Sequence, residues 1–493
     1  MTSDRRSATL LVLALAALRY RSALTEDWRW LFDQGFVLTE AMRLSRGELP
    51  YADYFTLYGP LEPLLLALPT ALFGPELALL IGLRSLCWAL GVVCLTRLAA
   101  RCASPVSALG TFAVALSLGW LVLPQPSLSV VHAVPLLLAR GWAADERGER
   151  RCTYAAGLAA AVTALFRWDV GGLVFAVGLF GCAWAARRRK RPLGHALGPF
   201  VLGFLPALLG YAVLVGLAGP EPVLETLAQL RACAPYRSLP LFQASSGRWA
   251  GLAVIALGAL LQTRAAWVAR RSTKPRGLAN ALALLLLLGL LPYGSFRADA
   301  DHLVPAAAPA AVGLAHAFAR LRTRGGRRLL LFALAATLLC LGVRSGLRLQ
   351  GRVPVGVPGL RGLRMEAREA ASYRELLSLA ERHLPADGFF YSGPAEHARH
   401  LYNDALLYAL VRHPVPTRYH QCNPGITTTE SVQREMLVEF SRHEPALVAR
   451  RLDSWHPEAN RSARAGSSLL DEYLRAHYRE VWRGTHHALY VPR

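Results

Sequence analysis

The chain has 493 residues, of which 53% are hydrophobic and 18% are charged, and its mean hydropathy is +0.29. These values exclude a disordered chain and argue against an ordinary soluble enzyme, so they favour a polytopic membrane protein. The 55 Lys and Arg residues outnumber the 33 Asp and Glu residues, which gives a net charge of +22. Because most basic residues cluster between apolar stretches, we assign this excess to cytoplasmic loops that contact membrane lipids, and we expect no nucleic-acid partner.

Eleven apolar stretches approach the length of a membrane-spanning helix, for which about 20 residues are typical and about 17 suffice. A further stretch, 61–73, is short and contains two prolines, so it predicts a re-entrant or interfacial helix. In chain order the predicted spans are 7–24, 76–97, 105–123, 125–140, 152–167, 170–187, 196–218, 249–268, 277–294, 303–320 and 327–345.

The distribution of basic residues predicts the orientation of these spans. If the N-terminus is cytoplasmic, the loops on that side carry 23 Lys and Arg residues and the external loops carry eight. Basic residues accumulate in cytoplasmic loops, so we expect a cytoplasmic N-terminus and, with eleven spans, an extracytoplasmic C-terminal region. The high usage of Ala, Arg and Gly indicates a bacterium, and the expected location is its inner (plasma) membrane.

Composition divides the chain into a transmembrane domain over 1–345, which includes an external loop 25–75, a Gly-, Pro- and Arg-rich linker over 346–365, and an extracytoplasmic domain over 366–493. Strand and helix patterns alternate in the last domain. Its predicted strands are 389–393, 446–453 and 487–493, and its predicted helices are 397–411, 430–440 and 468–478. The predicted fold class is therefore a polytopic α-helical membrane protein with about 11 transmembrane helices and a small C-terminal α/β domain.

The first external loop, 25–60, contains a predicted amphipathic helix that starts at Asp33. Its apolar face carries Val37, Leu38, Ala41, Met42 and Leu44, and its polar face carries Thr39, Glu40, Arg43 and Arg46. We expect such a helix to lie flat at the membrane surface. Asp33 would sit where the helix dipole favours a carboxylate, and a plain N-cap aspartate is the alternative interpretation.

Several motifs of this loop occur together in one known family. They are Asp33-Gln34-Gly35, 47–53 (GELPYAD), 58–63 (YGPLEP), Leu72-Phe73-Gly74 and Arg84. This pattern resembles the first external loop of the glycosyltransferase-C superfamily (GT-C), above all the branch of protein O-mannosyltransferases, ArnT-like aminoarabinose transferases and related bacterial polyprenyl-phosphate-sugar transferases. In that family an aspartate early in this loop is catalytic, and Asp33 matches it. Many relatives have two adjacent acids, whereas Gln34 follows Asp33 here, so a metal-binding pair is not implied.

The resemblance extends to two further external segments, 166–172 and 297–303, and to the outer domain. There it includes Asn403, Asp404, Leu407, Tyr408, Pro424, Gly425 and Gln433. In the outer domain, Tyr402, Asn403, Asp404 and Tyr408 either offer contacts to a sugar or cap and pack a helix. The resemblance implies a polyprenyl-phosphate sugar as donor and a lipid, glycan or protein as acceptor.

A phosphate leaving group needs positive charge, and the guanidinium fork binds phosphate oxygens in pairs. Arg297 is the first candidate for the donor phosphate, followed by Arg167 and then Arg43. Asp33 would accept the proton of the acceptor hydroxyl as the general base of an inverting displacement. The candidate substrate-binding residues are Asp53, Tyr58, Asp169, Asp299, Asp301 and His302.

Alternatives stay open for some of these groups. Asp299 and Asp301 form a DxD-like pair that suits a divalent cation, although we expect no cofactor and favour sugar binding, orientation of Arg297 or helix capping. Arg167 and Asp169 would equally well form an internal ion pair.

Two rival functions and one covalent bond also stay open. A transporter or flippase should show internal repeats, of which we find none that convinces. A non-catalytic membrane scaffold would tolerate the loss of Asp33 or Arg297. Cys233 and Cys422 would both lie outside the cytoplasm, where a disulfide is permitted.

Overall fold

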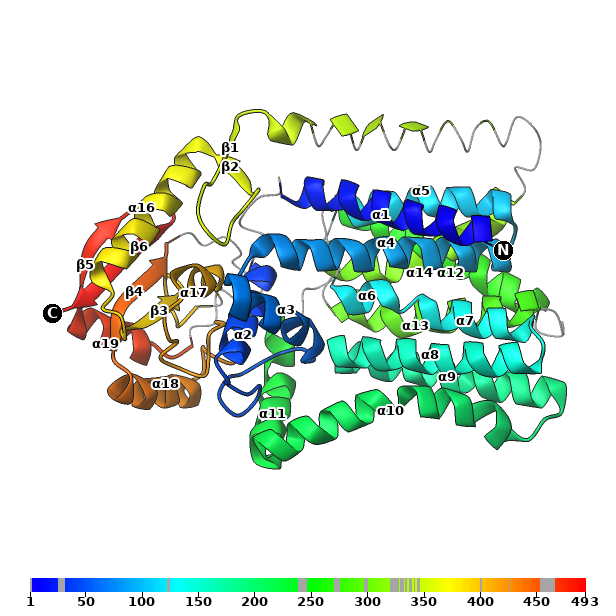
Figure 1. Cartoon of the computed structure of the whole chain (residues 1–493), viewed down its shortest axis with the longest axis horizontal. Coiled ribbons are helices and arrows are strands. Elements are labelled where there is room, and N and C mark those ends of the chain that lie inside the picture. Colours follow the sequence, from blue (N-terminus) through cyan, green and yellow to red (C-terminus); the bar gives the residue numbers. More distant parts are fainter. Residues whose placement is uncertain are drawn as a thin grey trace. The chain divides into compact units, whose positions relative to one another are not determined.

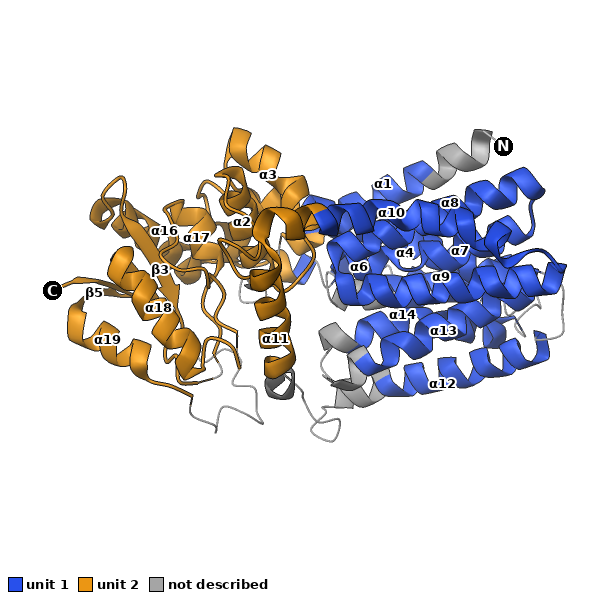
Figure 2. Ribbon diagram, turned by 90° about the horizontal axis from the view of Figure 1, so that it is seen from below, with its two compact units in different colours: residues 1–21, 82–212, 240–347 blue, residues 22–81, 213–239, 348–493 orange. Residues whose placement is uncertain are grey.

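The structure is a computed structural model, and the chain folds into two compact units (Figure 2). Residues 1–21, 82–212 and 240–347 form the helical unit, and residues 22–81, 213–239 and 348–493 form the mixed unit. The structure describes residues 2–24, 32–121, 125–237, 246–269, 275–296, 300–319, 346–399, 401–423, 425–452 and 466–493, with scattered residues between 328 and 343. Some side chains at the edges of these ranges, including those of Asp301 and His302, lie outside the description.

The helical unit is built from helices at nearly all the predicted spans (Figure 1). They are α1 (Thr2–Ala23), α4 (Leu77–Cys102), α5 (Pro105–Leu121), α6 (Pro126–Val130), α7 (Ala133–Trp142), α8 (Glu146–Phe166), α9 (Trp168–Arg189), α10 (Leu193–Ala218), α12 (Ser246–Ala269), α13 (Pro275–Phe296) and α14 (Ala300–Phe318). The helices α4 and α10 each continue into the mixed unit. The predicted span 327–345 falls largely outside the described residues.

The prediction of one continuous helix over 125–140 is wrong. The chain forms α6 and α7, separated by Val131 and His132. Pro135 follows in the first turn of α7, and it has no N–H to donate to the carbonyl of residue 131. The proline therefore fits the start of a new helix better than the interior of a long one.

Five helices in the described part of the chain are long and apolar enough to cross a membrane: α4, α9, α10, α12 and α13. Most of the apolar surface of α10 and α12 faces outward, because only 22% of the apolar window of α10 and 17% of that of α12 are buried inside the protein. Exposed leucines such as Leu208, Leu209 and Leu260 cover these surfaces. Lipid is the solvent such surfaces require, so the chain is a multi-pass membrane protein.

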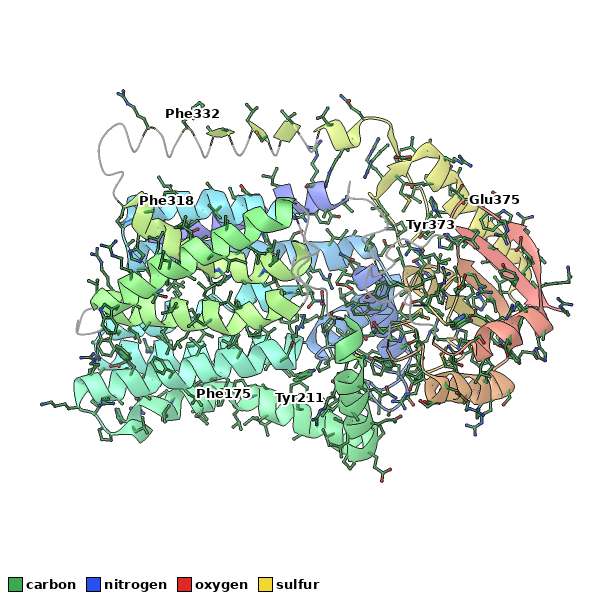
Figure 3. All side chains as sticks on the ribbon, turned by 180° about the vertical axis from the view of Figure 1, so that it is seen from behind. Phe175, Tyr211, Phe318, Phe332, Tyr373 and Glu375 are labelled. Atoms are coloured by element: carbon green, nitrogen blue, oxygen red, sulfur yellow. The ribbon has the colours of Figure 1, made fainter. Side chains whose placement is uncertain are left out.

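Small residues allow the helices of this unit to approach closely. A Cβ on Gly258 of α12 would lie 2.4 Å from the carbonyl oxygen of Ala310 on α14, and one on Gly313 would lie 2.1 Å from that of Gly258. Aromatic rings also pack between helices: the ring centre of Phe175 on α9, which Figure 3 labels, lies 4.3 Å from that of Phe204 on α10. This is the packing expected where helices associate without a hydrophobic driving force between them.

The mixed unit contains a four-stranded sheet in the order β3-β4-β6-β5. Its strands are β3 (Phe389–Gly393), β4 (Pro445–Arg451), β5 (Tyr478–Arg483) and β6 (His487–Pro492), of which β3 and β4 are parallel and the other pairs are antiparallel. In Figure 1, α16 (Ala367–His383) covers one face, and α18 (Glu430–Arg442) and α19 (Leu469–His477) cover the other. The predicted α/β domain is thus present, and β5 and α16 are additions to it.

Three further helices and a small hairpin complete this unit. They are α2 (Phe32–Ser45), α3 (Leu61–Phe73) and α11 (Pro220–Arg237), with β1 (Arg352–Pro354) paired to β2 (Arg364–Glu366). The hairpin occupies most of the stretch 346–365 that we interpreted as a linker. Residues 22–81 pack with the C-terminal region, whereas the composition grouped them with the transmembrane domain.

The predicted helix over 397–411 is wrong in its first two thirds. Only α17 (Leu406–Val411) is helical, and most residues before it adopt turns and irregular backbone. The Asp404 carboxylate accepts a hydrogen bond from the Leu406 N–H at 3.2 Å. Short side chains that bond nearby backbone groups in this way compete with helix formation.

Candidate active site

Asp33 lies in the first turn of α2, where the amphipathic pattern places it. Its side chain is half-buried. It makes no hydrogen bond or ion pair with any residue that the structure describes. This carboxylate is therefore accessible and uncommitted, as a general base must be before its substrate arrives.

Gly35 and Thr39 fix the start of α2 against the turn that precedes α17. A Cβ at position 35 would lie 2.4 Å from the backbone nitrogen of Leu406, so only glycine permits this approach. One turn further, the Thr39 hydroxyl lies 3.0 Å from the Ala405 carbonyl oxygen and 2.9 Å from that of Gly35. The motif that contains Asp33 is thus anchored directly to the C-terminal region.

Arg43, in the last turn of α2, is committed to protein acceptors. Its Nε donates to Glu48 at 2.6 Å, Nη1 to the Thr417 carbonyl at 3.0 Å and Nη2 to the Asp53 carbonyl at 2.8 Å. The guanidinium also lies 5.1 Å from the ring centre of Tyr54, and the residue is only 3% exposed. These contacts contradict the expectation that Arg43 binds a donor phosphate, because its donors face the protein interior.

The polar face of α2 is buried, whereas we expected a helix with that face in solvent. Glu40 is 1% exposed and hydrogen-bonds to Thr56. Gln421 donates to its carboxyl at 3.4 Å, and Nε2 of His420 lies 3.8 Å away. Burial raises the pKa of Glu40 to about 8 and lowers that of His420 well below its ordinary value. Both groups are therefore mainly neutral at pH 7.

The loop after α2 places two predicted substrate-binding residues. Asp53 is exposed, and its carboxylate accepts the Leu49 N–H at 2.7 Å, which closes the turn. Tyr58 is half-buried, with its ring 5.6 Å from that of Phe36. Both side chains remain accessible enough to touch a ligand.

The polar residues around 403 hold backbone together. Asn403 donates to the carbonyls of Ser392 and His420, at 2.9 and 3.0 Å, and accepts the Cys422 N–H at 2.9 Å. The Tyr408 hydroxyl bonds to both backbone groups of Ser392. Of the two interpretations of these residues, capping and packing is the one that their contacts support.

In the helical unit, Arg167 and Asp169 form an ion pair between α8 and α9. Nε and Nη2 of Arg167 each lie 2.8 Å from a different carboxylate oxygen of Asp169. Nη1 donates to Gln125 at 2.9 Å. The internal ion pair that we kept as the alternative is present, and a phosphate would have to compete with Asp169 for this guanidinium.

Comparisons with known proteins bear on the fold as a whole. No family model matches the sequence, and no curated protein matches it. Among solved structures, ArnT from Cupriavidus metallidurans bound to undecaprenyl phosphate matches with a TM-score of 0.57 and 15% identity, over 98% of this chain and 97% of that one. The chain has the GT-C fold.

Two further structures support this assignment of the GT-C fold. The apo state of the same ArnT matches with a TM-score of 0.53 and 14% identity, over 99% of this chain and 98% of that one. The Archaeoglobus fulgidus oligosaccharyltransferase in complex with Zn and sulfate matches with a TM-score of 0.50 and 12% identity, over 97% of this chain and 72% of that one. The resemblance inferred from loop motifs thus holds for the whole architecture.

The structure does not describe the side chains of four predicted site residues. Arg297 and Asp299 lie outside the described residues. Asp301 and His302 lie in the first turn of α14, and their side chains are not described. The pairing of Asp33 with a phosphate bound by Arg297 therefore stays a prediction.

Within the described residues, no three His, Cys, Asp or Glu side chains gather as a metal site. Asp299 and the side chain of Asp301, which form the DxD-like pair, lie outside these described groups. Cys233 and Cys422 are separate buried thiols, so the disulfide that we left open does not form.

For the buried cluster around Glu40, sequence reasoning had one local signal and none for the partners of Glu40. Glu40 follows Asp33 by seven residues, so both lie on the same side of α2, two turns apart. Its neighbours His420 and Gln421 are some 380 residues away in the chain. Helical periodicity carries no information about contacts over such a separation.

Proposed function

We propose that this chain is a membrane glycosyltransferase that takes a sugar from a polyprenyl phosphate and delivers it to an acceptor outside the cytoplasm. The observation that carries the proposal is the state of Asp33. It is half-exposed, it has no partner among the described residues, and it is held in place by Gly35 and Thr39. A solved structure with a similar fold contains undecaprenyl phosphate, which supports a lipid-linked phosphate as the donor.

In this reaction an oxygen of the acceptor hydroxyl attacks the anomeric carbon of the sugar. The bond from that carbon to the phosphate oxygen breaks, and its electron pair leaves with the phosphate. Asp33 accepts the hydroxyl proton, so a single displacement inverts the anomeric centre. An arginine stabilises the charge that develops on the leaving phosphate, and we retain Arg297 for this role, with Arg167 second.

The remaining parts of the proposal concern setting and partners. The excess of basic residues in one set of loops supports a cytoplasmic N-terminus and an extracytoplasmic C-terminal region, in the inner membrane of a bacterium. The acceptor is a lipid, a glycan or a protein. Asp53 and Tyr58, beside α2, are the described candidates for contact with either substrate. A carboxylate base needs no metal, so we propose none.

The test uses the purified full-length protein in lipid nanodiscs, with a panel of radiolabelled undecaprenyl-phosphate sugars. We expect one donor to be turned over and Asp33→Asn to abolish most of that turnover. The matched control is Glu221→Gln, which removes an exposed carboxylate from the first turn of another helix, α11, and should leave turnover unchanged. Turnover of no donor, or full activity in Asp33→Asn, would contradict the proposal.

The same preparation separates the rival functions. A flippase would move a polyprenyl-phosphate sugar between leaflets of a proteoliposome without breaking the sugar–phosphate bond. A scaffold would do neither and would tolerate Asp33→Asn in cells. The transferase alone releases free polyprenyl phosphate in proportion to the sugar transferred.

A further inference from the structure

A groove lies in the mixed unit where α19 meets the sheet. It has a volume of about 300 Å³. This size is at the lower end for ligand pockets and suits a monosaccharide derivative rather than a long chain. Its lining residues are Val448, Arg450, Leu474, Arg475, Tyr478, Arg479, Glu480, Tyr490 and Arg493.

The topology brings the arginines of this groove together from separate elements. Arg450 is on β4, Arg475 in the last turn of α19, Arg479 at the start of β5, and Arg493 follows β6. Because β5 begins directly after α19, Arg475 and Arg479 flank one junction. The sheet register aligns Val448, Tyr490 and Glu480 in one row across the three strands, which forms the floor.

Two arginines of the groove, Arg475 and Arg479, form no ion pair with the described residues. The carboxylate side chain of Glu480, which also lines the groove, is already held by Arg483 at 2.6 Å and by the Tyr490 hydroxyl at 3.0 Å. Arg479 is exposed and makes no hydrogen bond or ion pair with the described residues. Arg475 is exposed and uses only Nε, toward a backbone carbonyl 3.2 Å away. The terminal N–H groups of these two arginines are therefore open to an anion.

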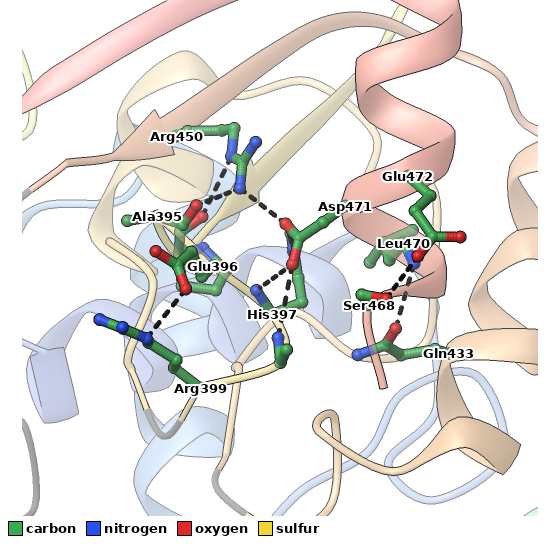
Figure 4. Close-up of polar contacts among 12 residues, drawn as sticks. Ala395, Glu396, His397, Arg399, Gln433, Arg450, Ser468, Leu470, Asp471 and Glu472 are labelled. Atoms are coloured by element: carbon green, nitrogen blue, oxygen red, sulfur yellow. Dashed lines mark hydrogen bonds and ion pairs between the residues drawn. The ribbon is translucent and has the colours of Figure 1, made fainter. Parts of the chain in front are cut away.

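The inner wall of the groove is rigidly supported. Arg450 bonds to Asp471 at 2.6 Å and to two backbone carbonyls, as Figure 4 shows. Asp471 accepts from His397 at 2.8 Å, and the other ring nitrogen of His397 lies 2.8 Å from the Tyr391 hydroxyl. All members of this chain behind Arg450 are buried. These contacts occupy Nε and Nη2 of Arg450 and fix it as part of the wall beside the exposed Arg475 and Arg479.

The floor of the groove suits a sugar ring better than a lipid tail. Val448 and Leu474 are buried, and Tyr478 and Tyr490 add aromatic carbon with their hydroxyls already bonded. No large hydrophobic side chain among the lining residues is exposed at the rim. A membrane-binding surface would present such side chains.

We propose that this groove binds a phosphorylated saccharide, with Arg475 and Arg479 on the phosphate and the Tyr490 side of the floor against the ring. Guanidinium groups bind phosphate oxygens in pairs, and aromatic faces suit the apolar faces of sugar rings. The idea that the bound saccharide is an acceptor rests on the proposed function. The binding of a phosphorylated saccharide to the groove does not depend on it.

The test measures binding to the full-length protein in detergent by calorimetry, with glucose 1-phosphate, inorganic phosphate and glucose as probes. We expect glucose 1-phosphate to bind most tightly and glucose to show no binding. The double variant Arg475→Glu with Arg479→Glu should weaken glucose 1-phosphate more than about tenfold, because each lost bond to a charged group is worth about a factor of ten or more. Arg368→Glu, an exposed arginine on α16 at the opposite face of the sheet, is the control and should bind as the unaltered protein does.

Four outcomes would overturn this inference. They are no binding of glucose 1-phosphate, unchanged binding in the double variant, an equal loss in Arg368→Glu, and inorganic phosphate binding as tightly as glucose 1-phosphate. If the protein bound phosphatidylglycerol vesicles through the two arginines but did not bind the saccharide phosphate, the groove would be a lipid-binding surface instead. Failure of the proposed function can be told apart from failure of this inference. Turnover that does not depend on Asp33 would contradict the proposed function, but it would not change the calorimetric binding at the groove.

Discussion

The two ends of α2 carry ionisable side chains in opposite situations. In the first turn, Asp33 is half-exposed and has no partner among the described residues. In the last two turns, Glu40 and Arg43 are 1% and 3% exposed and are bonded to the loops at 48–56 and 417–421. The first turn of α2 thus carries a group that is free to react, and its last two turns carry groups that anchor the helix. Substitution of Asp33 should therefore lower activity and spare stability, whereas substitution of the buried groups should lower stability.

The largest effect should come from Asp33→Asn. A general base contributes about 10²- to 10⁴-fold to a rate, so we expect turnover to fall by about that factor. Because Asp33 supports no described contact, the melting temperature measured by intrinsic fluorescence should stay the same. A much lower melting temperature in this variant would show that Asp33 stabilises the fold, as Glu40 and Arg43 are expected to do.

Arg43→Met should give the opposite result. Methionine keeps much of the apolar stem but leaves the carbonyls of Asp53 and Thr417 and the Glu48 carboxylate without their donor. We expect a loss of about 2–4 kcal/mol in the free energy of unfolding, seen as a lower melting temperature.

The matched control for that variant is Arg46→Met, three residues further along. Arg46 is exposed, and among the described residues it bonds to the carbonyls of Arg412 and His413, so its removal should change the melting temperature little. Equal melting temperatures for the two variants would remove the distinction between a buried and an exposed arginine on which the comparison depends.

Gly35→Ala tests the contact between the start of α2 and the start of α17. The added Cβ would lie 2.4 Å from the Leu406 nitrogen, so α2 must shift away from α17. We expect a loss of about 1–3 kcal/mol, as for other overpacked sites, and a partial loss of turnover because Asp33 moves. Gly216→Ala on α10, where a Cβ would meet no atom within 4 Å, should be neutral or stabilising. Unchanged stability and turnover in Gly35→Ala would show that this close approach is not required.

The sequence predicted the parts of this fold that depend on local patterns. Nine of the eleven spans predicted from apolar runs each coincide with a single described helix, and alternation located β3, β4 and β6. Hydropathy predicted one helix over 125–140, because it does not detect the end of α6 and the start of α7, where Pro135 lies in the first turn. The helical pattern before α17 was overridden by Asn403 and Asp404, whose side chains bond to backbone.

For the candidate site, the sequence predicted the position of Asp33 on a helix and misjudged the environment of that helix. Amphipathicity says that two faces differ, but it does not say that the polar face meets solvent. Here both faces of α2 are buried, since Val37 and Met42 are each 2% exposed and Thr39 is fully buried. The polar partners lie beyond residue 400, where no local signal connects them to α2.

Glu40→Gln offers the finest test of the anchored end. The pKa of Glu40 is about 8 in the folded protein and near its ordinary value of 4.5 in the unfolded chain. Between these values the folded state holds a proton that the unfolded chain has released, so its contribution to stability is complete below pH 4.5 and is lost as the pH rises through 8. Glutamine does not titrate, and the variant should therefore lose less stability than the unaltered protein between pH 5 and pH 8. The difference in melting temperature between the variant and the unaltered protein should therefore change by about 1 °C per pH unit over this range.

A second buried carboxyl does not disturb this test. Burial raises the pKa of Glu439 to about 7, which adds a pH dependence of the same sign to both proteins and cancels in the difference. Parallel melting profiles would mean that Glu40 is charged in the folded state, and the buried face of α2 would then have to supply it with a cation.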